Sequence, residues 1–296
     1  MNLRTVEQDV GFSGIGIHSG LPVKMTVRAY NKLGIFFRRA DLYNETLVQA
    51  IYKNVCDTNR NTTIGNLKSV HVKTIEHLMA ALFIAGVDSA LIEINGVEVP
   101  ILDGGASSFY NKITEAGITK GKNQNQKIIV KKPVRVTAHE IWPELPIERQ
   151  NDSYVELLPS QNSALNIHAD FRVEGKMQSF DYSYDGTQRS ITNFSQNLAP
   201  ARTFGKRSEW EYLRKRNMGL GADEKNTVIY DRDKALNQRW ENEIARHKIL
   251  DAIGDMFTSG GFIVGNLTSY KGNHAMNNMV LRKLFSNSEN YAIINT

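Results

Sequence analysis

The segment RHKILDAIGD, residues 246–255, places ionisable side chains within an apolar helical pattern. In a helix, His247 and Asp251 lie one turn apart on the same face, and Asp255 extends that row by one more turn. Such a row usually marks a solvated face, but the apolar residues between these three predict a largely buried helix over about residues 238–257. Buried charges need partners or a metal, and an imidazole and a carboxylate so placed can bind one divalent ion. We therefore expect this helix to carry part of a buried metal site.

The composition is that of an ordinary globular protein: 296 residues, 41% hydrophobic and 23% charged, enough for two domains. The single cysteine, Cys56, excludes a disulfide framework and a cysteine-based zinc finger, and it fits a reducing compartment. No apolar run has the length of a membrane span, and the first nine residues lack the apolar core of a signal peptide. The sequence thus predicts a cytoplasmic protein without stable membrane insertion.

The net charge of +5 is spread along the chain, with only small basic clusters at residues 131–132 and 214–216. A nucleic-acid-binding protein usually concentrates its positive charge in one patch or helix. A weak basic excess suits an anionic small substrate, such as a phosphorylated one, about as well. We expect a small-molecule substrate and no nucleic-acid partner, although the charge alone does not decide between them.

A polar segment without apolar periodicity, residues 121–127, is predicted to link two halves, residues 1–122 and 127–296. In the first half, strands are expected at 22–27, 34–38 and 90–94, and helices at 74–82 and 107–116. In the second half, strands are expected at 128–130, 134–136, 154–158, 165–171, 228–230 and 262–264, and helices at 208–216, 238–257 and 275–285. Runs of strands with helices between them indicate an α+β protein of two similar-sized domains.

A second candidate site follows Thr74, which is a good N-cap for the helix after it. This cap places Glu76 and His77 in the first turn, where the helix dipole favours an ionised glutamate. The two side chains can serve one metal, His77 as a ligand and Glu76 as a base beside a bound water. On this pair alone, a favourable N-terminal charge and a half-buried histidine would be the simpler interpretation. A polar loop that brings Lys271 and His274 together before another helix is a third, weaker candidate.

Combined, these segments predict one catalytic site. His77, His247 and Asp251 supply three nitrogen and oxygen ligands and leave a fourth position open, as in catalytic rather than structural zinc sites. Glu76 would take a proton from water, and His274 would protonate a leaving amine. The predicted reaction is metal-assisted hydrolysis of an amide or ester.

The glycine-rich segment GIGIHSG, residues 14–20, does not have the spacing of a dinucleotide-binding fingerprint or of a Walker loop. The chain also contains no Gly-x-Ser-x-Gly nucleophile elbow. We therefore expect a glycine-bent strand or turn here, lining a pocket with His18.

Taken in order, these motifs resemble the UDP-3-O-acyl-N-acetylglucosamine deacetylase family, whose members catalyse the committed step of lipid A biosynthesis in Gram-negative bacteria. The resemblance covers nearly the whole chain, and its motifs are highly specific in combination. They are GIGIHSG at 14–20, RRAD at 38–41, TIEHL at 74–78, VPILDG at 99–104, ARTFG at 201–205, RHKILDAIGD at 246–255 and YKGNHAMNN at 270–278.

The resemblance implies an enzyme with one catalytic zinc ion, held by His77, His247 and Asp251; iron also suits this set of donors. Thr203 would stabilise the tetrahedral oxyanion, and Asp255 would hold and tune the general acid. The other implied site residues are the catalytic Glu76 and His274 and the substrate-contacting Phe204, Lys248, Lys271 and His18.

The family's fold implies two sheet-and-helix layers packed face to face, with the active site at their junction. An insert at about residues 206–229 would form a passage for the acyl chain, involving Trp210, Leu213, Met218 and Leu220. The resemblance also favours a monomer.

The sequence departs from the family after residue 216, before the metal-binding helix at 236–243, and at 139–150 and 172–177. None of these segments holds an implied metal ligand, so the departures bear on acyl-chain preference and efficiency more than on reaction type. The alternative is a diverged relative that binds a nucleotide sugar or lipid without hydrolysing it. Glu76 and His274 argue against that alternative, because a binding protein needs neither a base nor an acid.

Overall fold

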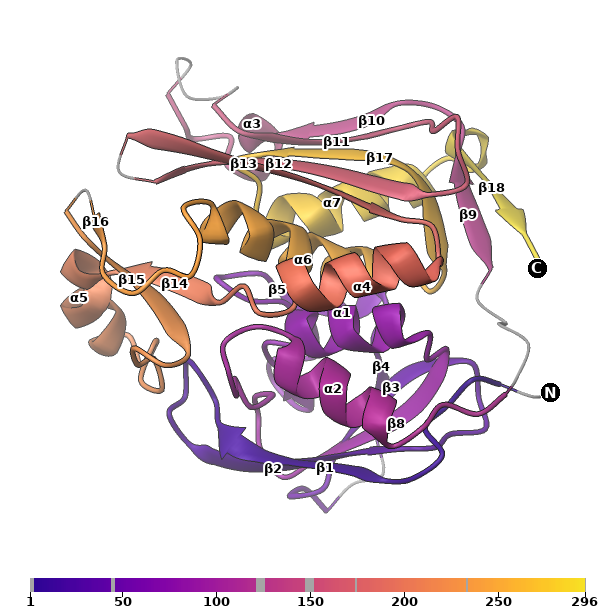
Figure 1. Cartoon of the computed structure of the whole chain (residues 1–296), viewed down its shortest axis with the longest axis horizontal. Coiled ribbons are helices and arrows are strands. Elements are labelled where there is room, and N and C mark those ends of the chain that lie inside the picture. The colour runs from indigo at the N-terminus through magenta and orange to yellow at the C-terminus, as the bar shows by residue number, and fades with distance from the viewer. Residues whose placement is uncertain are drawn as a thin grey trace.

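In the computed structural model, two β-sheets form the outer layers of the molecule, and helices from both halves of the chain fill the space between them (Figure 1). The structure describes residues 3–43, 46–120, 126–146, 152–173, 175–232 and 234–295. Helices and sheets in both halves confirm the predicted α+β class. The predicted boundary between residues 122 and 127 stays a prediction, because residues 121–125 lie outside the described ones.

The first half builds a five-stranded sheet in the order β1-β2-β8-β3-β4, in which only the β3–β8 pair is parallel. Its strands are β1 (Val10–Ile15), β2 (Pro22–Arg28), β3 (Gly34–Arg39), β4 (Leu47–Gln49) and β8 (Ser89–Ile94). Helices α1 (Glu76–Ala85) and α2 (Ser107–Glu115) cover one face of it. A small separate sheet, β5 (Val55–Asp57), β6 (Thr63–Gly65) and β7 (His71–Val72), follows the short helix η1 (Tyr52–Asn54).

The second half builds a sheet around the order β10-β11-β17-β12-β13, to which β9 and β18 are joined through β17. Its strands are β9 (Lys127–Val130), β10 (Val134–Thr137), β11 (Tyr154–Leu158), β12 (Leu165–Val173), β13 (Lys176–Tyr184), β17 (Phe262–Tyr270) and β18 (Tyr291–Ile294). Its helices are α3 (Ala138–Ile141), α4 (Gln188–Asn197), α6 (Glu243–Phe257), α7 (His274–Phe285) and the short η4 (Ser288–Asn290).

An insert between α4 and α6 projects to one side of the layers (Figure 1). It consists of β14 (Thr203–Lys206), η3 (Arg207–Glu209), α5 (Trp210–Arg214), β15 (Thr227–Asp231) and β16 (Lys234–Ala235), and its three strands form a sheet of their own. None of the helices in the described residues is both long and apolar enough to cross a membrane.

Helices α1 and α6 pack against each other at the centre of the molecule. Every residue of α1 except Ala85 is buried, as expected for a helix that is apolar on nearly all sides. Gly254 makes this contact close, because a Cβ at that position would meet the carbonyl oxygen of Glu76. One hydrophobic core runs through both halves, so the two sheets and their helices are held as one layered body.

The structure corrects several predicted elements. Helix α6 begins at Glu243 rather than near residue 238, because the Glu243 side chain accepts hydrogen bonds from the Arg239 N–H and from Arg202. Strand β17 continues from Phe262 to Tyr270 through Gly265, where a Cβ would crowd the Val130 side chain at 2.9 Å. The hairpin partner β13 and helix α4 were not predicted at all.

Thr74 is not the N-cap of α1. The cap position is Ile75, which makes no side-chain capping bond, and Thr74 has a left-handed backbone with φ 59°. Its hydroxyl instead donates to Glu98 at 3.0 Å. Glu98 is buried and also accepts from the backbone N–H groups of His18 and Ser19. The turn before α1 is therefore fixed by a tertiary contact, which local sequence cannot reveal.

Candidate active site

Three buried side chains converge where α1 meets α6. On α6, Nε2 of His247 lies 3.3 Å from Oδ1 of Asp251, one turn further along. His77, in the first turn of α1, brings its own Nε2 to 3.4 Å from the same oxygen. The two imidazole rings meet edge to face, and one donor atom from each of the three residues lies within 4.8 Å of the others. The structure thus brings together the three residues predicted to bind a metal.

The donor set fits a divalent cation. Oδ1 of Asp251 is buried and has no hydrogen-bond partner among the described residues, an unfavourable state unless a cation lies beside it. Nδ1 of His247 lies 3.0 Å from the Ala201 carbonyl oxygen, to which it must donate, so Nε2 keeps a free lone pair. Burial lowers the pKa of His247 to about 3. The ring is therefore neutral, which is the form that binds metals.

The other oxygen of Asp251 has a cationic partner. Nζ of Lys248 lies 2.9 Å from Oδ2. Burial opposes ionisation of this aspartate, but the positive charges of Lys248 and His274 favour it, and the pKa of Asp251 lies well below its ordinary value. Lys248, expected to contact substrate, also supports a candidate metal ligand, and its ammonium group lies 5.3 Å from the centre of the Phe204 ring.

Glu76 and His274 line the same cavity as the three candidate metal ligands. Oε1 of Glu76 and Nε2 of His274 are 3.9 Å apart, and that nitrogen is also 3.9 Å from Oδ2 of Asp251. Burial raises the pKa of Glu76, which favours a carboxylate able to hold a proton. Burial opposes the charge on His274, but Asp255 and Glu76 outweigh it and raise the pKa of His274 to about 9. The site therefore holds a proton acceptor and a proton donor side by side.

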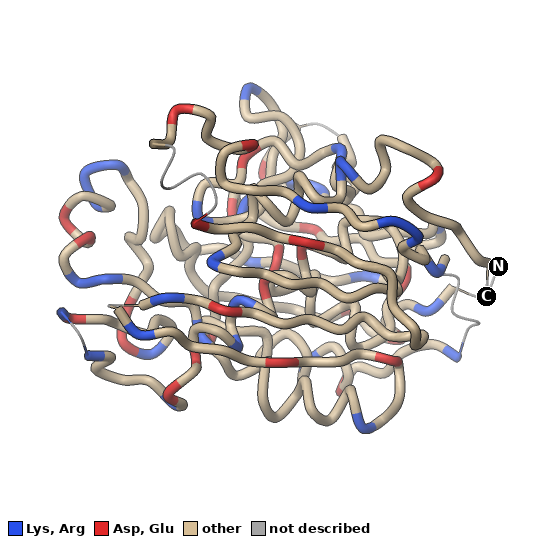
Figure 2. Tube along the Cα trace, turned by 90° about the horizontal axis from the view of Figure 1, so that it is seen from above, with Lys and Arg blue, Asp and Glu red and all other residues tan. Residues whose placement is uncertain are grey.

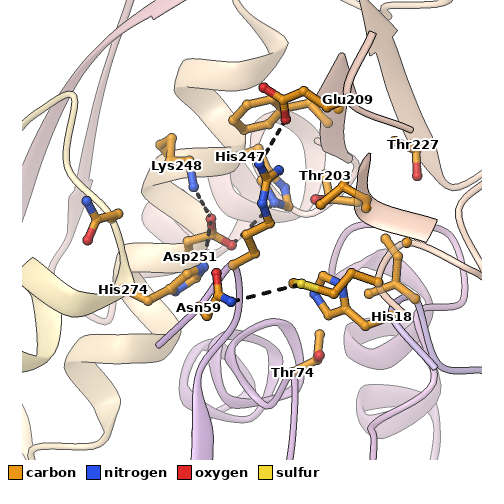
Figure 3. Close-up of a pocket in the computed structure, with 18 of the residues that line it drawn as sticks. His18, Asn59, Thr74, Thr203, Glu209, Thr227, His247, Lys248, Asp251 and His274 are labelled. Carbon is orange, nitrogen blue, oxygen red and sulfur yellow. Dashed lines mark hydrogen bonds and ion pairs between the residues drawn. The ribbon is translucent and has the colours of Figure 1, made fainter. Parts of the chain in front are cut away.

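Asp255 lies behind His274 and fixes its ring. Its Oδ2 is 2.9 Å from Nδ1 of His274 and accepts a second hydrogen bond, also 2.9 Å long, from the Asn277 amide. Asn273 caps the start of α7 by accepting from the Met276 N–H, and this cap places His274 at the first position of the helix. The imidazole consequently points its Nε2 toward the cavity (Figure 3).

The cavity has a volume of about 720 Å³, and ten of the eleven predicted site residues line it; Asp255 is the exception. Thr203 and Phe204 reach it from β14, and the Phe204 ring lies edge to face with those of Phe171 and His247. Lys271 and His18 line it as well, from the loop after β17 and from the glycine-rich turn after β1. Figure 3 shows His18 and Thr203 across the cavity from His274.

The cavity continues between the β5–β6 loop and the insert, lined there by Trp210, Leu213 and Met218. Leu220, expected in the same passage, does not line it: it is 42% exposed and lies against Gly20. Two contacts link the walls of the passage. Arg60 binds Glu209 at 2.8 Å, and the Asn59 amide lies 4.0 Å from the sulfur of Met218 (Figure 3).

Sequence reasoning missed three contributors to the site. Thr62 touches both Glu76 and Asp255, the Ala201 carbonyl orients His247, and Asn277 binds Asp255. Asn277 lies in a motif that the sequence singled out, and Ala201 starts another. Thr62 stands in a polar run with no such signal, and only the tertiary structure reveals it.

Two histidines and an aspartate in a buried cavity, with a glutamate and a further histidine beside them, are typical of a metal-dependent hydrolase. The chain belongs to the UDP-3-O-acyl N-acetylglycosamine deacetylase family, whose model matches residues 3–286. It is 35% identical to the UDP-3-O-acyl-N-acetylglucosamine deacetylase of Idiomarina loihiensis, over 96% of this chain and 89% of that protein. The enzymes of the same name from Haemophilus ducreyi and Aliivibrio fischeri are each 34% identical to this chain. The match to the first covers 98% of this chain and 92% of that protein, and the match to the second covers 97% and 90%.

Proposed function

We propose that this protein is a metal-dependent deacetylase that hydrolyses the N-acetyl group of UDP-3-O-acyl-N-acetylglucosamine and releases acetate, a step of lipid A biosynthesis. The observation that carries the proposal is the buried, unpartnered Oδ1 of Asp251 between two imidazoles, with Glu76 and His274 beside it. Family membership and the names of the relatives support the substrate.

His77, His247 and Asp251 would hold the metal, which we propose to be zinc, although iron suits the same donors. Zinc bound there would supply Lewis-acid polarisation of the amide carbonyl. The protein's own contribution is to keep His247 neutral and oriented through Ala201, and to keep Asp251 ionised beside Lys248.

Glu76 acts as the general base and His274 as the general acid. As water attacks the acetyl carbonyl carbon, Glu76 takes one of its protons. When the carbon–nitrogen bond breaks, His274 gives its proton to the departing amine, so acetate and the free amino sugar result. Oε1 of Glu76 and Nε2 of His274 are 3.9 Å apart, so the base and the acid can each reach one side of the same amide group. Asp255 keeps His274 protonated before the transfer.

The remaining cavity residues position the substrate. Thr203 would donate to the developing oxyanion, and Phe204 would pack against the sugar or acyl chain. Lys248, Lys271 and His18 would contact its polar and phosphate groups. The passage beside α5 would receive the acyl chain, because Trp210, Leu213 and Met218 line it there.

We propose a cytoplasmic monomer that acts on a small molecule and not on nucleic acid. Along the described part of the backbone, the Lys and Arg positions are interspersed with those of Asp and Glu (Figure 2), whereas a nucleic-acid-binding protein usually concentrates its basic residues. A non-catalytic binding relative is disfavoured, because burying Glu76 and His274 side by side is costly and serves binding poorly.

The test is deacetylation of UDP-3-O-acyl-N-acetylglucosamine by the purified protein, with chelator and with zinc added back. We expect acetate release that chelation abolishes and zinc restores. Asp251→Ala should lose zinc and activity, whereas His274→Ala should keep zinc and turn over far more slowly. His168→Ala is a matched control, because His168 also lies between two aspartates but outside the cavity. Full zinc occupancy and an unchanged rate in Asp251→Ala would refute the assignment.

A further inference from the structure

Thr62 connects the two proton-transferring groups of the site. It lies in the loop between β5 and β6 and is only 2% exposed. Its backbone N–H donates to Oε2 of Glu76 at 2.9 Å. Its hydroxyl donates to Oδ1 of Asp255 at 2.5 Å and lies 3.3 Å from Nδ1 of His274. One small residue thus holds the carboxylate of the proposed base and the carboxylate that orients the proposed acid.

The bond to Glu76 fixes which oxygen faces the substrate space. Because Oε2 is held by the Thr62 N–H, the carboxylate cannot rotate freely about its final torsion. Oε1 is left on the side of His274, 3.9 Å from Nε2. A base works efficiently when its accepting oxygen is held within hydrogen-bonding reach of the attacking water.

The bond to Asp255 completes the support of the acid. Oδ2 already accepts from His274 and Asn277, and Oδ1 accepts from Thr62. Asp255 is only 3% exposed, so without the hydroxyl its Oδ1 would lose this donor in a buried place. The carboxylate would then be held through Oδ2 alone, and the His274 ring would be less firmly oriented.

We propose that Thr62 is a positioning residue that keeps the general base and the general acid at a fixed separation during hydrolysis. This inference rests on the proposed function. It concerns the turnover step rather than metal binding, because the hydrogen-bonding contacts of Thr62 go to Glu76, Asp255 and His274 and not to the candidate metal ligands.

The chain offers a matched control in the next residue. Thr63 is also buried, at 0% exposure, and its hydroxyl also donates to a side chain, Oδ1 of Asn61 at 2.6 Å. Among the described residues, no hydrogen bond joins Thr63 to Glu76, Asp255 or His274. Replacing either threonine by valine removes one buried hydroxyl of the same kind, so a difference between the two variants reports the position of Thr62 and not the loss of a hydroxyl in general.

The experiment compares Thr62→Val, Thr62→Ser and Thr63→Val by kcat, KM and zinc affinity, with rates normalised to zinc content. We expect Thr62→Val to lower kcat roughly 10- to 100-fold, the usual effect of losing a group that orients a catalytic residue, with KM and zinc affinity within about twofold of the wild type. Thr62→Ser should recover most of kcat, and Thr63→Val should keep it. Thr62→Ala gives the same comparison if the valine variant does not fold.

An unchanged kcat in Thr62→Val, an equal fall in Thr63→Val, or no recovery in Thr62→Ser would each overturn the positioning role while leaving the proposed function intact. A fall in zinc affinity that accounts for the lost rate would also overturn it. If the zinc-loaded wild type does not deacetylate the substrate, the proposed function fails and this inference fails with it.

Discussion

Gly254→Ala tests whether the close contact of α1 and α6 sets the metal site. The new methyl would meet the carbonyl oxygen of Glu76 and lie 2.7 Å from its carbonyl carbon and 3.0 Å from its Cα. Ordinary contact begins at 3.4 Å, so the carbon contact alone requires the backbones to part by about 0.7 Å, and the closer carbonyl oxygen requires more. Both belong to helices, and neither can yield by turning a side chain.

The substitution should lower both the stability of the fold and the affinity of the site for metal. Overpacking costs about 1–3 kcal/mol, while alanine gains about 1 kcal/mol over glycine in a helix interior. The free energy of unfolding should therefore fall by about 2 kcal/mol or more, because the contact is with backbone atoms that cannot turn aside. A metal site tolerates deviations of about 0.2 Å in its ligand distances. Moving the turn that carries Glu76 and His77 away from His247 and Asp251 should weaken zinc binding at least about tenfold.

The assay is zinc affinity by competition with a chelator, together with urea unfolding. Gly11→Ala is the control, because a Cβ on Gly11 meets nothing within 4 Å; its zinc affinity should match that of the wild type. If Gly254→Ala binds zinc and releases acetate as the wild type does, the α1–α6 contact does not set the ligand geometry and the reasoning is wrong.

Further predictions concern protonation, a buried ion pair and metal removal. In protein from which a chelator has removed the metal, NMR of the His274 ring should show a pKa of about 9. Asp255→Asn should lower this pKa, and an unchanged pKa in that variant would exclude Asp255 as the cause of the shift. Because this pKa lies above the ordinary 6.5, the stabilisation it reflects is complete below about pH 6.5 and is lost as the pH rises through 9. Arg202→Met should lower the free energy of unfolding by about 3–5 kcal/mol, because it leaves the buried Glu243 without its cationic partner. Arg207→Met should change it by less than about 1 kcal/mol, because the side chains of Arg207 and its partner Asp231 are 50% and 41% exposed. Equal urea midpoints for the two variants would contradict this prediction. Free zinc at 100 times its dissociation constant should raise the free energy of unfolding of the wild type by about 2.7 kcal/mol in melting experiments. A similar increase in Asp251→Asn would show that the metal does not bind at Asp251.

The sequence alone predicted the class of the fold, the class of reaction and the residues that would share a site. The row from His247 to Asp255 is a local property, because helical periodicity places residues four apart on one face. The residues around Glu76 and His274 and, for Thr203, the family resemblance predicted a shared site, and the structure places all three side chains around one cavity. Element boundaries were less secure: α6 begins later than predicted because Glu243 bonds Arg202 and Arg239, and these are contacts of the folded state.

Only the tertiary structure decided how those side chains are held. The left-handed turn at Thr74, the free oxygen of Asp251 and the hydrogen bonds of Thr62 each depend on distant segments. Thr62 and Asp255 are 193 residues apart in the chain. The physical reason is that helical or strand periodicity can be read from residues adjacent in the sequence. The direction of a hydrogen bond in a buried site is instead set by packing between helices and loops that meet only when the chain has folded.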